Sequence, residues 1–330
     1  MRSLNLRFSS LLIPTLVVLA ITFAPNAARA QWRATVGAQS WDSARQALAF
    51  LPNEIWIHAG DDVTWTFQAG EIHTVTFLAT SPAAQVRPFF GVGCPGFSGE
   101  PASFDGTACI STPPLVKGAS FTVQFPAAGN YKLVCLVHPD MTGVVHVLDK
   151  AKLLPHNQTF YDAEATAQAQ ALLSDRDGEE DDTVVTIPGH VSAGSGEIST
   201  TGPGTQTLSV MRFMAHEIVI HAGQTVEWDN KDPEDPHTIT FGTEPAGDPF
   251  PPSANVTVDA DGARHAVINS PSDSVHSGFI QAAPQERTGL AQSPPFFTRF
   301  RVTFTHSGTY PYICALHDNL GMKGTIIVLP

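Results

Sequence analysis

Residues 129–143 are GNYKLVCLVHPDMTG, and residues 308–324 repeat the pattern as GTYPYICALHDNLGMKG. Each stretch has Gly-x-Tyr, a Cys, a His three positions later, and then Met and Gly. Two earlier blocks recur in the same order. EIWIHAGDDVTW at 54–65 matches EIVIHAGQTVEW at 217–228 in eight of twelve positions, and HTVTF at 73–77 matches HTITF at 237–241. Three matched blocks in one order indicate an internal duplication.

Each copy has the alternating apolar pattern of half-buried β-strands. Gly and Pro, 26 of each, punctuate these runs and favour short strands joined by turns. We therefore expect an all-β chain that forms an antiparallel sandwich twice. The strands predicted are 54–58, 63–67, 121–125, 300–304 and 325–329.

The rest of the chain suggests an exported protein with two domains. Residues 1–30 are predicted to be a signal peptide, because a basic start and an apolar stretch precede the small-x-small sequence that ends at Ala30. Residues 31–150 form the predicted domain one and 183–330 domain two. In the linker at 151–182, residues 161–173 predict a short helix and 175–182 an acidic, solvated run. The Gly-rich stretch 189–204 is expected to be the first loop of domain two.

Charge limits the partners that the protein can have. The chain carries 18 basic and 31 acidic residues, a formal net charge of −13. An acidic surface argues against nucleic-acid binding, which needs basic patches that face phosphate. Outside the signal, no stretch reaches transmembrane length, so the mature chain is expected to have no membrane span.

Two sets of side chains have the composition of a copper site. A Cys at a strand end points inward, its loop brings His and Met to the same place, and an upstream His arrives from a neighbouring strand. Two imidazoles and one thiolate suit copper in a trigonal site, with a thioether as the weak axial ligand. Zinc is the main competitor, although a site with one thiolate and a Met is a poor structural zinc site. The sets are His73, Cys135, His138 and Met141, and His237, Cys314, His317 and Met322.

With these motifs, both halves resemble cupredoxins, the plastocyanin/azurin family of type 1 blue copper proteins. The resemblance covers most of residues 40–150 and 205–330. It implies two Greek-key β-sandwiches in tandem, each with one type 1 copper held by the four ligands above. The Cys-x2-His-x2-Met loop of domain one is similar to that of amicyanin, and the Cys-x2-His-x4-Met loop of domain two to that of plastocyanin. Met141, in the shorter loop, is the least secure ligand.

The resemblance also bears on activity. Two-domain laccases need His-x-His pairs and copper nitrite reductases need a His beside the copper Cys, and this sequence contains neither. We therefore expect an electron-transfer protein without catalytic activity, periplasmic or secreted. The resemblance implies that electrons pass through His138 and His317, the ligands nearest the surface in cupredoxins, to a redox partner such as a basic cytochrome steered by the acidic surface. The alternatives are copper storage without a redox partner, and an oxidase-like or reductase-like enzyme with an interface copper.

The remaining cysteines and histidines have simpler explanations. Cys94 and Cys109 lie in one Gly/Pro-rich insertion without His at ligand spacing, which predicts a disulfide. His146 is expected on a strand surface. Duplication alone explains why His58 and His221 recur at equivalent positions, although a shared role in contacting a partner remains open. His265 and His276, in the long insertion of domain two, could shield the copper from water.

Overall fold

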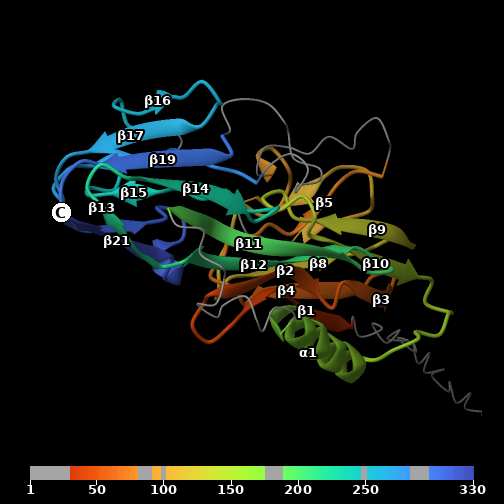
Figure 1. The fold of residues 1–330 in the computed structure, drawn as a ribbon. Helices are drawn as coiled ribbons and strands as arrows, with labels where there is room; N and C mark the ends of the chain where they lie inside the picture. The colour runs from red at the N-terminus through yellow and green to blue at the C-terminus, as the bar shows by residue number, and fades with distance from the viewer. Residues whose placement is uncertain (1–29, 81–90, 98–101, 175–188, 247–250, 283–296) are drawn as a thin grey trace, which may run out of the picture.

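The computed structural model describes residues 30–80, 91–97, 102–174, 189–246, 251–282 and 297–330 (Figure 1). Residues 1–29 of the predicted signal, the acidic run 175–182 and the boundary near residue 182 lie outside this part. The described chain is dominated by strands, with one α-helix between two β-sandwich domains. The prediction of two tandem sandwiches is confirmed.

The strands of the first half agree with the predicted runs at 54–58, 63–67 and 121–125. In the described residues they are β1 (Gln31–Gln39), β2 (Arg45–Leu51), β3 (Glu54–His58), β4 (Asp62–Phe67), β5 (Thr76–Phe77), β6 (Ala102–Ser103), β7 (Ile110–Ser111), β8 (Ser120–Gln124), β9 (Gly129–Val134) and β10 (Thr142–Leu148).

The second half repeats this order after helix α1 (Gln158–Ser174), and the predicted runs at 300–304 and 325–329 are strands. The described strands are β11 (His190–Thr200), β12 (Thr205–Met214), β13 (Glu217–His221), β14 (Thr225–Lys231), β15 (Thr240–Phe241), β16 (Thr257–Val258), β17 (Arg264–Ile268), β18 (Val275–His276), β19 (Arg299–Phe304), β20 (Gly308–Ile313) and β21 (Lys323–Leu329). A short 3₁₀ helix, η4 (Asp318–Leu320), precedes β21.

One sheet runs through both domains. Its order is β16-β17-β19-β14-β11-β12-β2-β1-β4-β8-β6, and each half of it packs against a smaller sheet, β3-β10-β9-β5-β7 in domain one or β13-β21-β20-β15-β18 in domain two. The expected antiparallel pairing holds for only part of each sandwich, because β1 pairs in parallel with β4 and β3 with β10, as do β11 with β14 and β13 with β21. Alternation within a strand reports which side chains are buried and carries no information on strand direction.

The two domains join where β2 pairs with β12. Arg45 lies opposite Val210 and Ala47 opposite Leu208. Val210 is the domain-two equivalent of Ala47. Each pairs with the residue that directly follows the bulge of its neighbouring strand, Val210 with Ser195 and Ala47 with Ala38. The register of the junction is therefore reciprocal, as expected when two duplicated domains join through the same strand edge.

The expectation of a loop at 189–204 was wrong. Residues 190–200 form β11, which pairs with β12 on one side and β14 on the other. Its glycines and serines suggest a loop by composition, but Val191 and Ala193 are fully buried. Tertiary pairing on both sides overrides the weak local preference.

Helix α1 contains the predicted 161–173 and extends it at both ends. It covers the outer face of the shared sheet next to β1 and β2 (Figure 1). On β2, Ala47, Ala49 and Leu51 pack against Leu172 of this helix, whereas the alternate residue Leu48 faces the core of domain one. The central strand is thus buried on both faces. Among the described residues, no helix is both long and apolar enough to span a membrane.

Each sandwich has an aromatic core below its metal-ligand candidates. In domain one, the Trp65 ring packs on Phe77 and Phe125, and in domain two Trp228 packs on Phe241 and Tyr312. The structure also contains the predicted disulfide between Cys94 and Cys109, which closes the insertion of domain one.

Candidate metal centres

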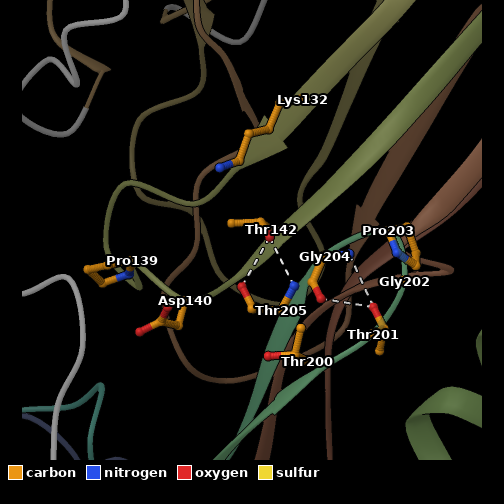
Figure 2. A pocket seen from close by; sticks show the side chains of 10 residues that line it. All are labelled: Lys132, Pro139, Asp140, Thr142, Thr200, Thr201, Gly202, Pro203, Gly204 and Thr205. Atoms are coloured by element: carbon orange, nitrogen blue, oxygen red, sulfur yellow. Dashed lines mark hydrogen bonds between the residues drawn. The ribbon is translucent and has the colours of Figure 1, made fainter.

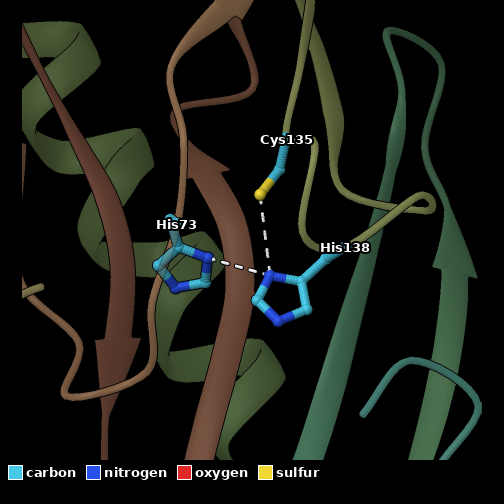
Figure 3. Close-up of side chains that lie close together, drawn as sticks. All are labelled: His73, Cys135 and His138. Carbon is cyan, nitrogen blue, oxygen red and sulfur yellow. Dashed lines mark hydrogen bonds between the residues drawn. The ribbon is translucent and has the colours of Figure 1, made fainter. Parts of the chain in front are cut away.

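Three predicted ligands of domain one converge on a single point (Figure 3). Nδ1 of His73 lies 3.1 Å from Nδ1 of His138, which lies 3.6 Å from Sγ of Cys135. All three side chains are completely buried. Because β5 pairs with β9, His73 just before β5 is held beside Cys135 just after β9.

Domain two reproduces this arrangement. Nδ1 of His237 lies 3.0 Å from Nδ1 of His317 and 3.8 Å from Sγ of Cys314, and Sγ of Cys314 lies 3.5 Å from Nδ1 of His317. In each set the three donor atoms lie within 4.8 Å of one another. Two imidazole nitrogens and a sulfur that converge in a dry site fit the donor set of a trigonal copper centre.

The predicted axial residues close the ligand loops. Met141 and Met322 have no exposed surface, and their carbonyl oxygens accept hydrogen bonds of 3.0 and 3.1 Å from the N–H groups of Cys135 and Cys314. These bonds fix both ends of each loop.

One threonine lies beside each sulfur, in a role that the sequence pattern did not predict. The N–H groups of Thr74 and Thr238 lie 3.4 Å from Sγ of Cys135 and Cys314. Each Thr Oγ1 also accepts a hydrogen bond from the residue that follows the Cys, at 2.8 and 2.7 Å. Their repeated place directly after the upstream His was the available signal. Hydrogen bonds to a ligating sulfur tune the potential of a copper site.

The electrostatics favour ionised thiols. Burial raises the pKa of the Cys135 thiol, but hydrogen bonds and charge from His138 and His73 outweigh burial and hold this pKa well below its ordinary value. At Cys314, burial is likewise outweighed by the charge of His317 and by hydrogen bonds from His237 and His317, so its pKa is also well below the ordinary value. The thiolate is the form that binds metal.

A glycine at a β-bulge makes room for each upstream histidine. Gly37 and Gly194 occupy equivalent bulges with φ of +66° and +76°. A Cβ on Gly37 would lie 2.8 Å from Nε2 of His73, and one on Gly194 would collide with the His237 ring. Left-handed φ and close ring approach both explain why glycine occurs here.

The expectation that the loop histidines lie near the surface was wrong. His138 is 0% exposed and His317 4% exposed. The domains meet with their metal loops face to face, so each loop histidine is covered by the other domain. Nε2 of His138 lies 3.0 Å from Asp235, and Nε2 of His317 lies 3.3 Å from Glu71.

The other histidines lie away from the donor atoms. His58 and His221 contact the backbone carbonyls of Lys152 and Pro330 through ring nitrogens, and His146 stacks on Trp56 at the sheet surface. His265 contacts Asp259 and Thr303 on the large sheet.

His276 is buried behind the centre of domain two. Its Nδ1 lies 2.8 Å from Oγ1 of Thr240, which contacts Oγ1 of Thr238 at 3.3 Å. It therefore supports the residues around Cys314 from the protein interior.

A pocket of about 610 Å³ opens at the domain boundary beside the metal loop of domain one (Figure 2). Pro139 and Asp140, directly after His138, form part of its wall, and the β11–β12 turn at 200–205 forms another part. Thr142 and Thr205 hydrogen-bond across the boundary inside it. The pocket lining contains none of the predicted metal ligands.

With two buried Cys-His-His centres in place, comparison with protein-family models decides the family. Residues 38–148 and 203–329 match the model described as "Copper binding proteins, plastocyanin/azurin family". The chain belongs to this family. A comparison with curated proteins finds no match.

Solved structures similar to this cupredoxin chain include several amicyanins. An oxidised amicyanin mutant has 20% identity over 36% of this chain and 82% of its own, with a TM-score of 0.25. A reduced Cu(I) amicyanin mutant at pH 4 has 21% identity over 37% of this chain and 87% of its own, also with a TM-score of 0.25.

Proposed function

We propose that this cupredoxin is an exported electron-transfer protein that holds one type 1 copper in each domain. The observation that carries the proposal is the occurrence, twice, of a buried sulfur and two imidazole nitrogens at one point. The ligands would be His73, Cys135, His138 and Met141 in domain one. In domain two they would be His237, Cys314, His317 and Met322. Bound copper supplies a one-electron change between Cu(I) and Cu(II).

The chain's own residues prepare each centre for this change. The buried loops exclude water, and the hydrogen bonds between Cys and Met fix the loop ends. Thr74 and Thr238 donate to the sulfurs from a neighbouring segment of the chain. A frame held in this way keeps the ligand positions similar in both oxidation states, which favours rapid electron exchange.

Burial of the loop histidines changes where an external partner can approach. His138 and His317 face each other's domain, so a cytochrome cannot dock directly on their imidazole edges. We infer that these edges connect the two centres and that an external partner uses another face of the acidic molecule. Faster exchange with a basic cytochrome at low salt than at high salt would support electrostatic steering, and an absence of salt dependence would contradict it.

The same burial favours a second candidate, copper storage without a redox partner. The two functions differ in the rate of electron exchange, because a storage site can bind copper tightly and exchange electrons slowly. Stopped-flow oxidation and reduction by small inorganic reagents, with potentials measured in parallel, distinguishes them. Rapid reversible exchange supports electron transfer, and slow exchange supports storage.

The test of the copper assignment is the visible spectrum of the purified chain loaded with Cu(II), recorded with its metal content. We expect an intense blue absorption and two coppers per chain. Cys135→Ser and Cys314→Ser should each remove one copper and its share of the colour. If only Cys314→Ser removed colour, domain one would be a scaffold, and a colourless, zinc-binding chain would overturn the proposal.

A further inference from the structure

Two carboxylates at equivalent positions cross the domain boundary in opposite directions. Glu71 lies two residues before His73, and Asp235 lies two residues before His237. Their side chains are 7% and 3% exposed. In both domains, an acid therefore lies two residues before the upstream histidine and reaches the domain boundary.

Each acid contacts a predicted ligand of the other domain. Oδ1 of Asp235 lies 3.0 Å from Nε2 of His138, and Oε2 of Glu71 lies 3.3 Å from Nε2 of His317. The other Glu71 oxygen lies 3.9 Å from Nε2 of His138, so this carboxylate faces both loop histidines. Within the described part of the chain, the ion pairs of the two acids are formed with histidines alone.

The upstream histidines provide an internal contrast. Nε2 of His73 and Nε2 of His237 are buried without a hydrogen-bond partner in the described chain. The nearest carboxylate oxygen to His237, from Asp232, is 3.9 Å away. An outer partner at hydrogen-bond distance is therefore a property of the loop histidines, and in both cases the other domain supplies it.

We propose that each domain completes the metal centre of the other: Asp235 holds His138, and Glu71 holds His317, with Nε2–H donating to the carboxylate and Nδ1 directed at the metal. The inference rests on the proposed copper function. Ligating histidines commonly donate their second ring N–H to a carboxylate, which fixes tautomer and ring orientation. Glu71 and Asp235 are thus positioning residues, and a single domain would have an incomplete centre.

The same atoms also suggest a competing arrangement. Glu71, His138 and Asp235 offer donor atoms within 4.8 Å of one another, and Oδ2 of Asp235 has no hydrogen-bond partner in the described chain. A third metal there would need Nε2 of His138 without its proton while Nδ1 faces Cys135. The hydrogen-bond arrangement needs only the neutral imidazole that ordinarily binds metal. Metal counting separates the two.

The experiment measures copper affinity across the boundary. In full-length Cys314→Ser protein, which keeps only the domain-one centre, Cu(I) affinity is measured by chelator competition for Asp235→Ala and Asp235→Asn. Loss of an outer-shell partner typically weakens metal binding about 10- to 100-fold. We expect a loss of this size for Ala and partial recovery for Asn, which retains an acceptor oxygen. The mirror experiment uses Cys135→Ser protein with Glu71→Ala and Glu71→Gln.

Glu217→Gln is the matched control, because it removes one acid from an exposed position on β13 of domain two. It should leave the affinity of the domain-one centre unchanged. If Asp235→Ala behaved like this control while Cys314→Ser protein still bound copper, the inference would be wrong and the copper assignment would stand. If the chain bound no copper, the proposed function would itself fail.

A spectroscopic readout tests position separately from stability. In diamagnetic Cu(I) protein, the Nε2 proton of His138 should give a slowly exchanging resonance that Asp235→Ala removes and Asp235→Asn retains. A proton that exchanges rapidly in unsubstituted protein would overturn the proposal. So would a third metal ion per chain that is lost in Asp235→Asn, because Nε2 would then bind metal.

Discussion

The two candidate metal loops bring the same predicted ligands together from different lengths of chain. The loop of domain one has two residues between His138 and Met141, and that of domain two has four between His317 and Met322. The hydrogen bonds that close them are nevertheless alike, with Cys N–H to Met carbonyl distances of 3.0 and 3.1 Å. Ligand geometry therefore depends on the loop ends, which the strands hold.

The extra residues of the longer loop pack against domain one at the domain boundary. They form η4, from which the nearly buried Leu320 reaches domain one at Gly70, where an added Cβ would lie 2.6 Å from a Leu320 methyl group. Arg212 fixes this turn by donating to the carbonyl of Leu320 at 2.8 Å.

The shorter loop contacts the other domain at the boundary through a backbone hydrogen bond. The N–H of Asp140 donates to Glu234 of domain two at 2.8 Å, where burial raises the Glu234 pKa to about 9. Glu234 precedes Asp235 as Gly70 precedes Glu71. The duplicated segments thus meet reciprocally, by apolar packing on one side and by a hydrogen bond on the other.

The bulge glycines should give the largest effect. Alanine at Gly194 combines a left-handed φ, costing about 1–2 kcal/mol, with overpacking against His237, costing about 1–3 kcal/mol. We expect Gly194→Ala to destabilise domain two strongly and to weaken its copper binding. Gly37→Ala should act in the same direction on domain one, less severely because its Cβ would approach His73 less closely. Chemical denaturation and metal titration measure both. Equal, small effects would contradict this account of the bulges.

The insertions of the two domains differ in what holds them. Replacing Cys94 and Cys109 by serine should destabilise domain one by about 3 kcal/mol, because the disulfide restricts the unfolded chain. The described residues of the domain-two insertion contain no disulfide. This insertion is held by strand pairing instead, of β16 with β17 and of β17 with β19. Native-state hydrogen exchange of β8 and β9 reports the stability of domain one, and exchange of β19 and β20 reports that of domain two. An equal loss of protection in both domains would show that the shared sheet makes them unfold together.

The longer loop can be tested at Leu320. Leu320→Ala should cost about 2 kcal/mol, at the lower end for buried leucine, because this side chain is 6% exposed. The copper affinity of domain two should change little, since the loop ends remain fixed. Val219→Ala, at an exposed position on β13, is the control and should be nearly neutral. A copper affinity that fell with Leu320→Ala would show that η4 also positions the ligands.

The smallest expected effect comes from a difference between the domains in how one ion pair depends on pH. His190 and Arg33 occupy equivalent strand positions, but Arg33 pairs with Asp162 of α1, whereas His190 pairs with Asp229 at 3.3 Å. The hydrogen bond to Asp229 raises the His190 pKa above its ordinary 6.5. Its stabilisation is thus fully present below pH 6.5 and is lost as pH rises through the raised pKa. Because the pair is partly exposed, we expect less than about 1 kcal/mol.

The measurement that checks this is the free energy of unfolding, determined for unsubstituted and His190→Gln protein between pH 6 and 8. The difference between the two should shrink as pH rises. A difference that stayed constant would mean that His190 acts through packing alone.

Some features were predictable because they are local in sequence. The Cys-x2-His loops and the alternation in β4 and β8 depend on neighbouring residues, so the pattern predicted both the strands and the candidate ligands. Strand β11 was not predictable in this way, because its glycines and serines resemble a loop and only pairing with β12 and β14 makes it a strand. Strand direction was missed for the same reason.

The sequence by itself determined the duplication, the sandwich class and the four candidate ligands in each half, because periodicity and motif spacing act over a few residues. Only the tertiary structure decided what surrounds those ligands. Pairing of β2 with β12 in a reciprocal register turns the metal loops toward each other, buries His138 and His317, and brings Glu71 and Asp235 to the opposite domains. No spacing along the chain encodes such a contact, since it depends on how two complete sheets join edge to edge.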